Sequence, residues 1–149
     1  MDNREKIIEL IFDDNEDAFT NWIVEQPLIL QPDILREFRD ITTELIKEAG
    51  AEEIPELEAM DKQTDIYEQS ILDEQVAAVN YELALIARDK TSEKITETMQ
   101  GVRDYLMDCI VTKADNAIPM LELAGKIIKS EKENGFYEPE NWKNILHLI

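Results

Sequence analysis

The chain is 149 residues long, close to the commonest size of a single domain, and it can bury a sizeable hydrophobic core. Its 34 acidic and 15 basic residues give a net charge of −19; residues 1–75, with 22 acidic and 6 basic residues, carry −16 of it. A field of this sign repels phosphate backbones and anionic lipid, so we expect neither direct nucleic-acid binding nor membrane binding, and a basic protein is the natural partner.

The cysteine content and the hydrophobic pattern restrict the fold class and the cellular compartment that we expect. Cys109 is the only cysteine, so no internal disulfide can form, and its apolar neighbours predict a small buried side chain rather than a nucleophile. No apolar run approaches the ~18 residues that span a bilayer, and no apolar signal core follows the N-terminus, so we expect a cytoplasmic protein. Because no segment alternates with period two, we expect an all-α fold that forms one domain over residues 1–149.

Three helices are predicted in the first fifty residues. Residues 2–12 and 17–26 carry apolar side chains at helical spacing, and a proline ends the second of these helices. The connector 28–30 is entirely apolar, so we expect it to be covered. Pro32 suits the first turn of a third helix, and Gly50 suits the left-handed residue that follows its last turn.

Residues 54–88 are predicted to form one long helix, with Pro55 in its first turn. Between positions 76 and 87 only Asn80 and Glu82 are polar, so we expect this segment to be a core helix that other helices wrap. Burial would raise the pKa of Glu82 and could make it a general base, although an outward-facing or base-paired Glu82 is the simpler interpretation.

Three more helices are predicted in the last sixty residues. Apolar spacing indicates a helix around 95–110, and Asp115 or Asn116 would cap the next one, which places Pro119 in its first turn. A last helix would begin at Pro139. The total is about seven helices joined by short links, which predicts an all-α single-domain bundle, or a short stack of antiparallel helical hairpins, around the long central helix.

The acidic segment that follows the first helix resembles a metal-binding motif. Asp13, Asp14 and Asp17 match the aspartate-rich DDxxD pattern of prenyl-transferring enzymes, in which carboxylates one turn apart hold magnesium. No second acidic cluster paired with basic residues accompanies them, and the chain has about half the length of such enzymes. The same run lacks a calcium loop's required residues, because Ala18 and Val24 stand where Gly and Glu are needed.

Glu52, Glu53 and Glu56 resemble the first half of the EExxE motif of all-α nucleotide pyrophosphohydrolases, which implies a Mg²⁺-dependent phosphohydrolase as an alternative function. The second half of that motif, an ExxD pair on the next helix, is missing. With one histidine, His147, and no glycine-rich loop, the chain lacks the residues for a zinc site, a catalytic triad or a nucleotide cradle. We therefore expect no catalytic residues, no metal and no cofactor.

Residues 123–137, with Ala124-Gly125 at the helix-crossing position and Gly135-x-Tyr137 at the turn, resemble part of a tetratricopeptide repeat. The resemblance extends over residues 118–148, and residues 18–50 are more loosely similar to the helical pairs that flank such repeats. It implies a scaffold of helical hairpins that binds proteins, without catalytic residues.

These observations favour a non-enzymatic helical interaction protein, an adaptor, regulator or inhibitor that offers its acidic N-terminal half to a basic partner protein. A third function, besides the phosphohydrolase, is an acidic mimic of nucleic acid or an immunity-type inhibitor. The candidate contact residues are Asp13, Asp14, Glu16, Asp17, Glu52, Glu53, Glu56 and Glu58.

Overall fold

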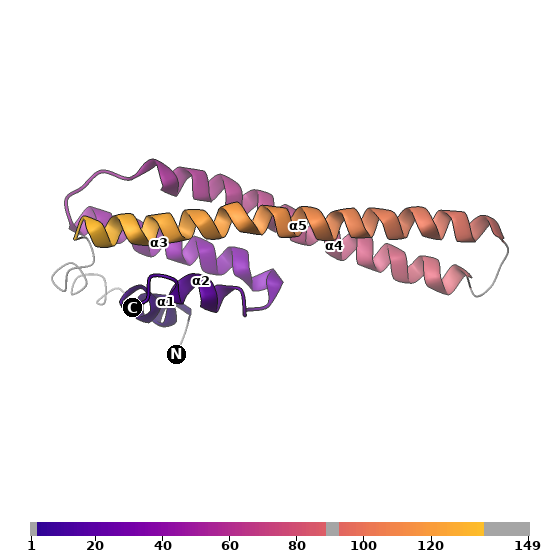
Figure 1. The fold of residues 1–149 in the computed structure, drawn as a ribbon, viewed down its shortest axis with the longest axis horizontal. Helices are drawn as coiled ribbons and strands as arrows, with labels where there is room; N and C mark the ends of the chain where they lie inside the picture. Colours follow the sequence, from indigo (N-terminus) through magenta and orange to yellow (C-terminus); the bar gives the residue numbers. More distant parts are fainter. Residues whose placement is uncertain (1–2, 89–92, 136–149) are drawn as a thin grey trace. The chain divides into compact units, whose positions relative to one another are not determined.

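The computed structural model describes residues 3–88 and 93–135, and within these ranges the regular secondary structure is entirely helical, without strands (Figure 1). The elements are α1 (Asn3–Ile11), α2 (Ala18–Ile23), the 3₁₀ helix η1 (Leu28–Leu30), α3 (Gln31–Glu48), α4 (Pro55–Arg88) and α5 (Glu93–Glu133). They divide into two compact units: unit 1 is Met1–Asp65 with Pro119–Ile149, and unit 2 is Ile66–Ile118. The expectation of a single domain stays a prediction.

Local sequence signals explain where the helices of unit 1 begin and end. Pro32 lies in the first turn of α3 and Pro55 is the first residue of α4, positions where a missing N–H is harmless. Gly50 follows α3 with a φ of 68°, and its N–H donates to the carbonyl of Lys47 at 3.0 Å. Ala51 N–H donates to the carbonyl of Ile46 at 3.1 Å. These two bonds form a Schellman cap, which confirms the predicted role of Gly50.

Unit 1 has a densely buried apolar core. The rings of Phe19 and Phe38 stack with centroids 4.5 Å apart, so α2 and α3 meet there. The buried apolar side chains of α1, α2 and α3 are Ile7, Ile8, Ile11, Phe19, Ile23, Ile34, Leu35, Phe38, Ile41, Leu45 and Ile46. The first turns of α4 and the end of α5 add Leu57, Met60, Met120, Ala124, Ile127 and Ile128. The apolar spacing of the sequence predicts most of this core for α1 to α3, but Phe12, which the same spacing places on the apolar face of the first helix, is 45 % exposed.

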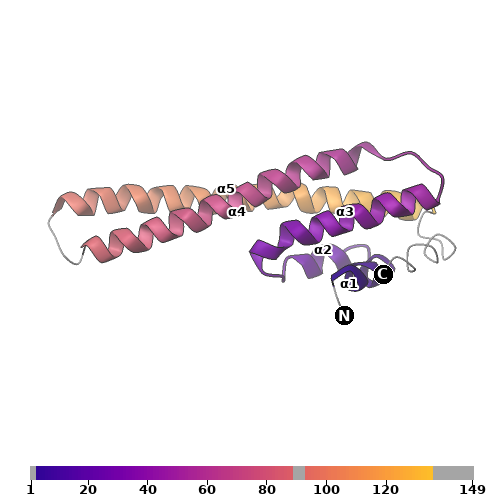
Figure 2. The same cartoon turned by 180° about the vertical axis from the view of Figure 1, so that it is seen from behind.

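Unit 2 is a hairpin of two antiparallel helical segments, residues 66–88 of α4 and 93–118 of α5, which lie side by side in both views (Figure 1; Figure 2). Polar contacts join them: Asn116 Nδ2 donates to Ser70 Oγ at 2.5 Å, and Lys113 Nζ lies 2.6 Å from a carboxylate oxygen of Glu74. Among the side chains of this unit that the structure describes, the buried apolar ones are Tyr67, Ile71, Ala77 and Cys109.

The prediction of seven helices is wrong for the segment around Pro119. The structure has one helix, α5, of 41 residues, with Pro119 inside it, so neither Asp115 nor Asn116 caps a new helix. A proline within a helix removes one backbone hydrogen bond, to the carbonyl four residues earlier. Here that carbonyl belongs to Asp115, and because Asp115 and Pro119 are both exposed, water can satisfy it. The helix predicted from Pro139 lies outside the described residues.

The prediction that other helices wrap residues 76–87 is also wrong. Val76, Val79, Leu83 and Ile86 are all more than half exposed, and Glu82 is exposed as well, so it is not a buried base. A two-helix hairpin offers each helix one neighbour, and a helix that is apolar on both sides therefore leaves one side bare. The connector 28–30 forms η1, and its three side chains are exposed rather than covered.

Within the described ranges, no helix combines the length and the apolar character that crossing a membrane requires.

Candidate interaction surfaces

The first predicted acidic segment, residues 13–17, links α1 and α2. Asp13 and Asn15 side chains accept hydrogen bonds from backbone N–H groups two residues onward, at 2.8 and 3.0 Å, so the link is built of two successive Asx turns. Lys132 at the end of α5 donates to the carbonyl of Asp13 at 2.7 Å. The carboxylates of Asp13, Asp14, Glu16 and Asp17 are exposed, and none of them forms an ion pair with another described residue.

The second predicted acidic segment, residues 52–58, begins in the link before α4. Glu52, Glu53 and Glu58 are exposed and Glu56 is half-buried. Glu53 lies 3.4 Å from a guanidinium nitrogen of Arg39. Among the residues that the structure describes, no group of three or more His, Cys, Asp or Glu side chains is placed to hold a metal ion. No hydrogen bond or ion pair joins this segment to residues 13–17 within the same ranges.

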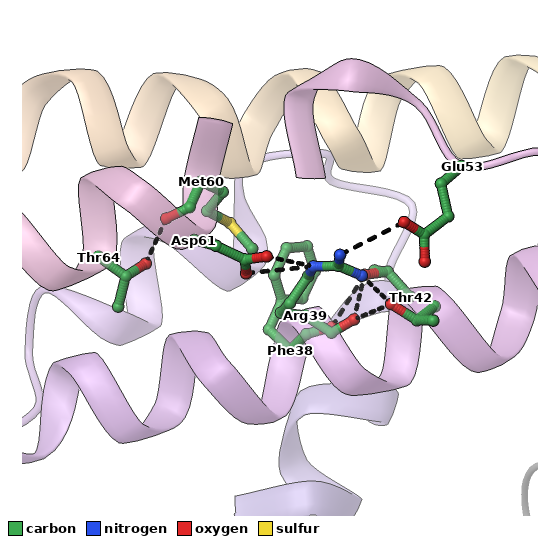
Figure 3. A network of polar contacts seen from close by, with 8 residues as sticks. Phe38, Arg39, Thr42, Glu53, Met60, Asp61 and Thr64 are labelled. Atoms are coloured by element: carbon green, nitrogen blue, oxygen red, sulfur yellow. Dashed lines mark hydrogen bonds and ion pairs between the residues drawn. The ribbon is translucent and has the colours of Figure 1, made fainter. Parts of the chain in front are cut away.

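Sequence reasoning missed a charged groove between α3 and the start of α4 (Figure 3). Arg39 is its centre: Nε donates to both carboxylate oxygens of Asp61, at 3.1 and 3.2 Å, one terminal nitrogen reaches Glu53, and the other donates to Thr43. Arg36 pairs with Asp33 at 3.3 Å and with Asp65 at 3.1 Å. The cavity, of about 360 Å³, is lined by Leu35, Arg36, Arg39, Asp40, Asp61, Thr64 and Asp65.

The chemistry of this groove is that of a tie between helices. Each guanidinium already faces at least two oxygen acceptors within unit 1. These ion pairs neutralise its charge and hold α3 against α4. The hydroxyl groups of Thr42 and Thr64 donate hydrogen bonds to backbone carbonyls of their own helices, those of Phe38 and Met60 respectively. The groove therefore fixes the first turns of α4 and offers little unneutralised positive charge to an anion.

Unit 2 carries a regular apolar surface on α4, which we call the outer stripe: Leu72, Val76, Val79, Leu83 and Ile86. These side chains are between 43 and 62 % exposed. Their spacing of four, three, four and three residues places them on one line along α4. At about 100° per residue, that line lies opposite the buried Tyr67, Ile71 and Ala77, which face α5. A shallow groove of about 290 Å³ runs along it between Leu72 and Asn80.

The flanks of the outer stripe are nearly neutral. Gln75 and Asn80 border it as carboxamides, and Asp73 and Glu82 are the acidic neighbours. All four are exposed. An apolar line of this length with a weakly charged rim is typical of a surface that packs against another helix.

A smaller cavity of about 180 Å³ lies elsewhere on the hairpin, lined by Ser70, Asp73, Tyr105, Asp108, Cys109 and Thr112. A hydrogen bond with Cys109 is the main cause that raises the pKa of Tyr105 above its ordinary value of 10. Burial, and then the nearby Glu74 carboxylate, raises the pKa of Tyr67 above the same value. Tyr67 is buried, and burial favours its neutral phenol. Cys109 is a free buried thiol, as its apolar neighbours predict.

Comparison with protein families, with curated proteins and with solved structures finds no match. The tetratricopeptide resemblance of residues 118–148 stays a prediction, and its second helix lies outside the described residues. The signal that could have revealed the outer stripe was present in the sequence. Residues 72–86 carry two apolar lines on opposite sides of one helix, and only one of them can face α5.

Proposed function

We propose that this chain is a non-enzymatic helical protein-interaction module that binds through the outer stripe of its hairpin. The observation that carries the proposal is the exposure of five large apolar side chains in one continuous line on α4. Exposed apolar area costs roughly 25 cal/mol per Å² relative to buried area, so a partner that covers it gains binding free energy. Scattered apolar residues need no such explanation, but a regular line does.

The two acidic segments of unit 1 support a basic partner as a second part of the proposal. Their exposed carboxylates at 13–17 and 52–58 would steer a positively charged protein and would matter less as salt rises. The acidic segments would raise the association rate and the selectivity of binding, whereas the outer stripe would supply the apolar area that is buried in the complex. The phosphohydrolase alternative would need Glu52, Glu53 and Glu56 to converge on a metal, and Glu53 is instead paired with Arg39.

A site-specific photocross-linker tests the outer stripe as an interaction surface. A photoreactive residue in place of Val79 should capture a discrete polypeptide on irradiation in the native host, because Val79 lies in the middle of the line. The same residue in place of Asp104, which is exposed on α5, is the matched control and should capture none. Equal cross-linking at both positions, or none at Val79, contradicts the proposal.

The acidic segments are tested separately by neutralisation. The variant with Asp13→Asn, Asp14→Asn, Glu16→Gln and Asp17→Asn should slow association with a basic partner found by cross-linking, and the loss should shrink at high salt. Association that stays equally fast at low salt would remove residues 13–17 from the binding surface without affecting the role of the outer stripe.

A further inference from the structure

The outer stripe has the register of a short coiled-coil seam. Leu72, Val79 and Ile86 stand at one of the two core positions of a seven-residue repeat, and Val76 and Leu83 stand at the other. All five are Leu, Val or Ile, so the line is complementary to another copy of itself. Symmetric pairing of one patch with its own copy is the commonest way in which soluble proteins associate.

Charge along α4 selects the direction of such a pair. The part of α4 before the stripe is acidic: Glu56, Glu58 and Glu68 add to Asp61 and Asp65, whose charges Arg39 and Arg36 partly offset, against the base Lys62. Parallel pairing of two α4 helices would set these acids beside their own copies. Antiparallel pairing separates them by the length of the stripe, roughly 20 Å at 1.5 Å per residue, beyond the Debye length of about 8 Å at physiological salt.

The flanks of the stripe also fit the antiparallel register. When Val76 of one copy packs against Val79 of the other, Leu72 packs against Leu83. Asp73 then lies opposite Asn80, and Gln75 lies opposite Glu82. Each acidic flank therefore faces a carboxamide, which can donate a hydrogen bond to it, and no two like charges meet across the seam.

We propose that the outer stripe binds a second copy of this chain, with the two α4 helices antiparallel. The inference rests on the proposed interaction function and names its partner. Because the seam is only 15 residues long, the interface is smaller than that of an obligate dimer, and the association is weak and concentration-dependent. Added salt strengthens it, because salt screens the repulsion between two chains of net charge −19. A basic partner would show the opposite salt dependence.

Sedimentation equilibrium on the full chain tests the proposal. The unaltered protein should show a monomer–dimer equilibrium that shifts toward dimer between low and physiological salt. The double variant Val79→Lys, Leu83→Lys should weaken dimerisation roughly 100-fold or more, because two ammonium groups per chain would have to be desolvated in the seam. Asp104→Lys is the matched control, since it changes the net charge by the same two units on exposed α5 surface and should preserve the dimer.

Disulfide cross-linking tests the direction of the pair. In a Cys109→Ser background, a mixture of Val76→Cys and Val79→Cys chains should cross-link faster than either chain alone, because positions 76 and 79 face each other only in the antiparallel register. Val79→Cys alone cross-linking fastest would overturn the antiparallel arrangement.

The outcomes separate this inference from the function on which it rests. A protein that stays monomeric at all concentrations and salts overturns pairing with a second copy, as does a dimer that survives the double lysine substitution. If Val79 then photocross-links to a different polypeptide, the interaction function stands and its partner is another protein. If Val79 cross-links to nothing, both fail.

Discussion

The two units bury their apolar side chains to very different extents. Unit 1 packs helices from several directions around Phe19 and Phe38, and its core residues are almost completely inaccessible. Unit 2 has one helix against one helix, and its α4 segment leaves five large apolar side chains bare on the far side. The hydrophobicity of a helix therefore does not by itself determine its burial. The number of neighbouring helices does.

The unit that buries its apolar side chains more completely also carries the larger net negative charge. Residues 66–118 hold 10 acidic and 5 basic residues, a net charge of −5, whereas the rest of the chain holds 24 and 10, a net charge of −14. The unit with the complete core therefore has the more highly charged surface, and the unit with the incomplete core has the more neutral one. The outer stripe, through which we propose that the chain associates, therefore lies on the unit with the more neutral surface.

The largest expected effect comes from breaking the core of unit 1. Phe38→Ala removes a fully buried ring that stacks on Phe19, and it should lower the free energy of unfolding by about 3–5 kcal/mol. Urea denaturation followed by circular dichroism measures the loss. Val79→Ala on the outer stripe is the contrasting substitution and should change the same quantity by less than about 0.5 kcal/mol in the monomer. Similar losses at both positions would erase the distinction between the units.

A smaller effect should follow from breaking the ion pair within the hairpin. The side chains of Glu74 and Lys113 are each less than a quarter exposed, and Lys113 Nζ lies 2.6 Å from a carboxylate oxygen of Glu74. Glu74→Gln should therefore lower the free energy of unfolding by about 1–2 kcal/mol. Hydrogen exchange should accelerate in α4 and α5 around positions 74 and 113 and not in α3. A double-mutant cycle with Lys113→Gln checks the attribution, because the second substitution should then cost less than it does alone.

Arg39 should contribute less, because its carboxylate partners are about half exposed. Arg39→Lys keeps the charge but loses the fork that reaches Asp61 and Glu53 together, and it should cost roughly 0.5–1 kcal/mol. The loss should shrink in high salt, whereas the loss from Phe38→Ala should not. Unfolding curves at two salt concentrations measure both. A salt-independent loss would mean that Arg39 acts through packing of its stem.

The smallest expected effect concerns pH. Because the pKa of Tyr67 is raised in the folded state, the unfolded chain loses that proton first, and stability should decline as the pH rises above 10. Tyr67→Phe should make this decline shallower, since phenylalanine has no proton to lose. Tyr105→Phe should also make the decline shallower, because the pKa of Tyr105 is raised in the folded state as well. Unfolding midpoints between pH 8 and 11 report the difference.

Local features of the fold could be predicted because they depend on a few neighbouring residues. Gly50 after α3, the prolines at the starts of α3 and α4, and the burial of Cys109 are of this kind. Pro119 was misjudged because a proline can end a helix or be accommodated within one, and the choice depends on whether water reaches the freed carbonyl.

The candidate surface could be predicted only in part. Exposure of four carboxylates at 13–17 follows from their density in the chain, since they cannot be buried together, but their role in binding stays a prediction. The outer stripe was mistaken for core because periodicity shows that a helix has two apolar sides without showing what lies against each. The groove around Arg39 joins residues 14 and 22 positions away, Glu53 and Asp61, and no spacing rule reaches that far.

Cys109 gives the hairpin a built-in reporter. It is the single thiol of the chain and lies almost wholly inaccessible on α5. Opening of the hairpin would expose the thiol further, so a thiol-specific dye should label the unmodified protein faster when the two helices part. The rate of labelling, and its decrease at higher concentrations of this chain, can be measured on the native sequence without any substitution.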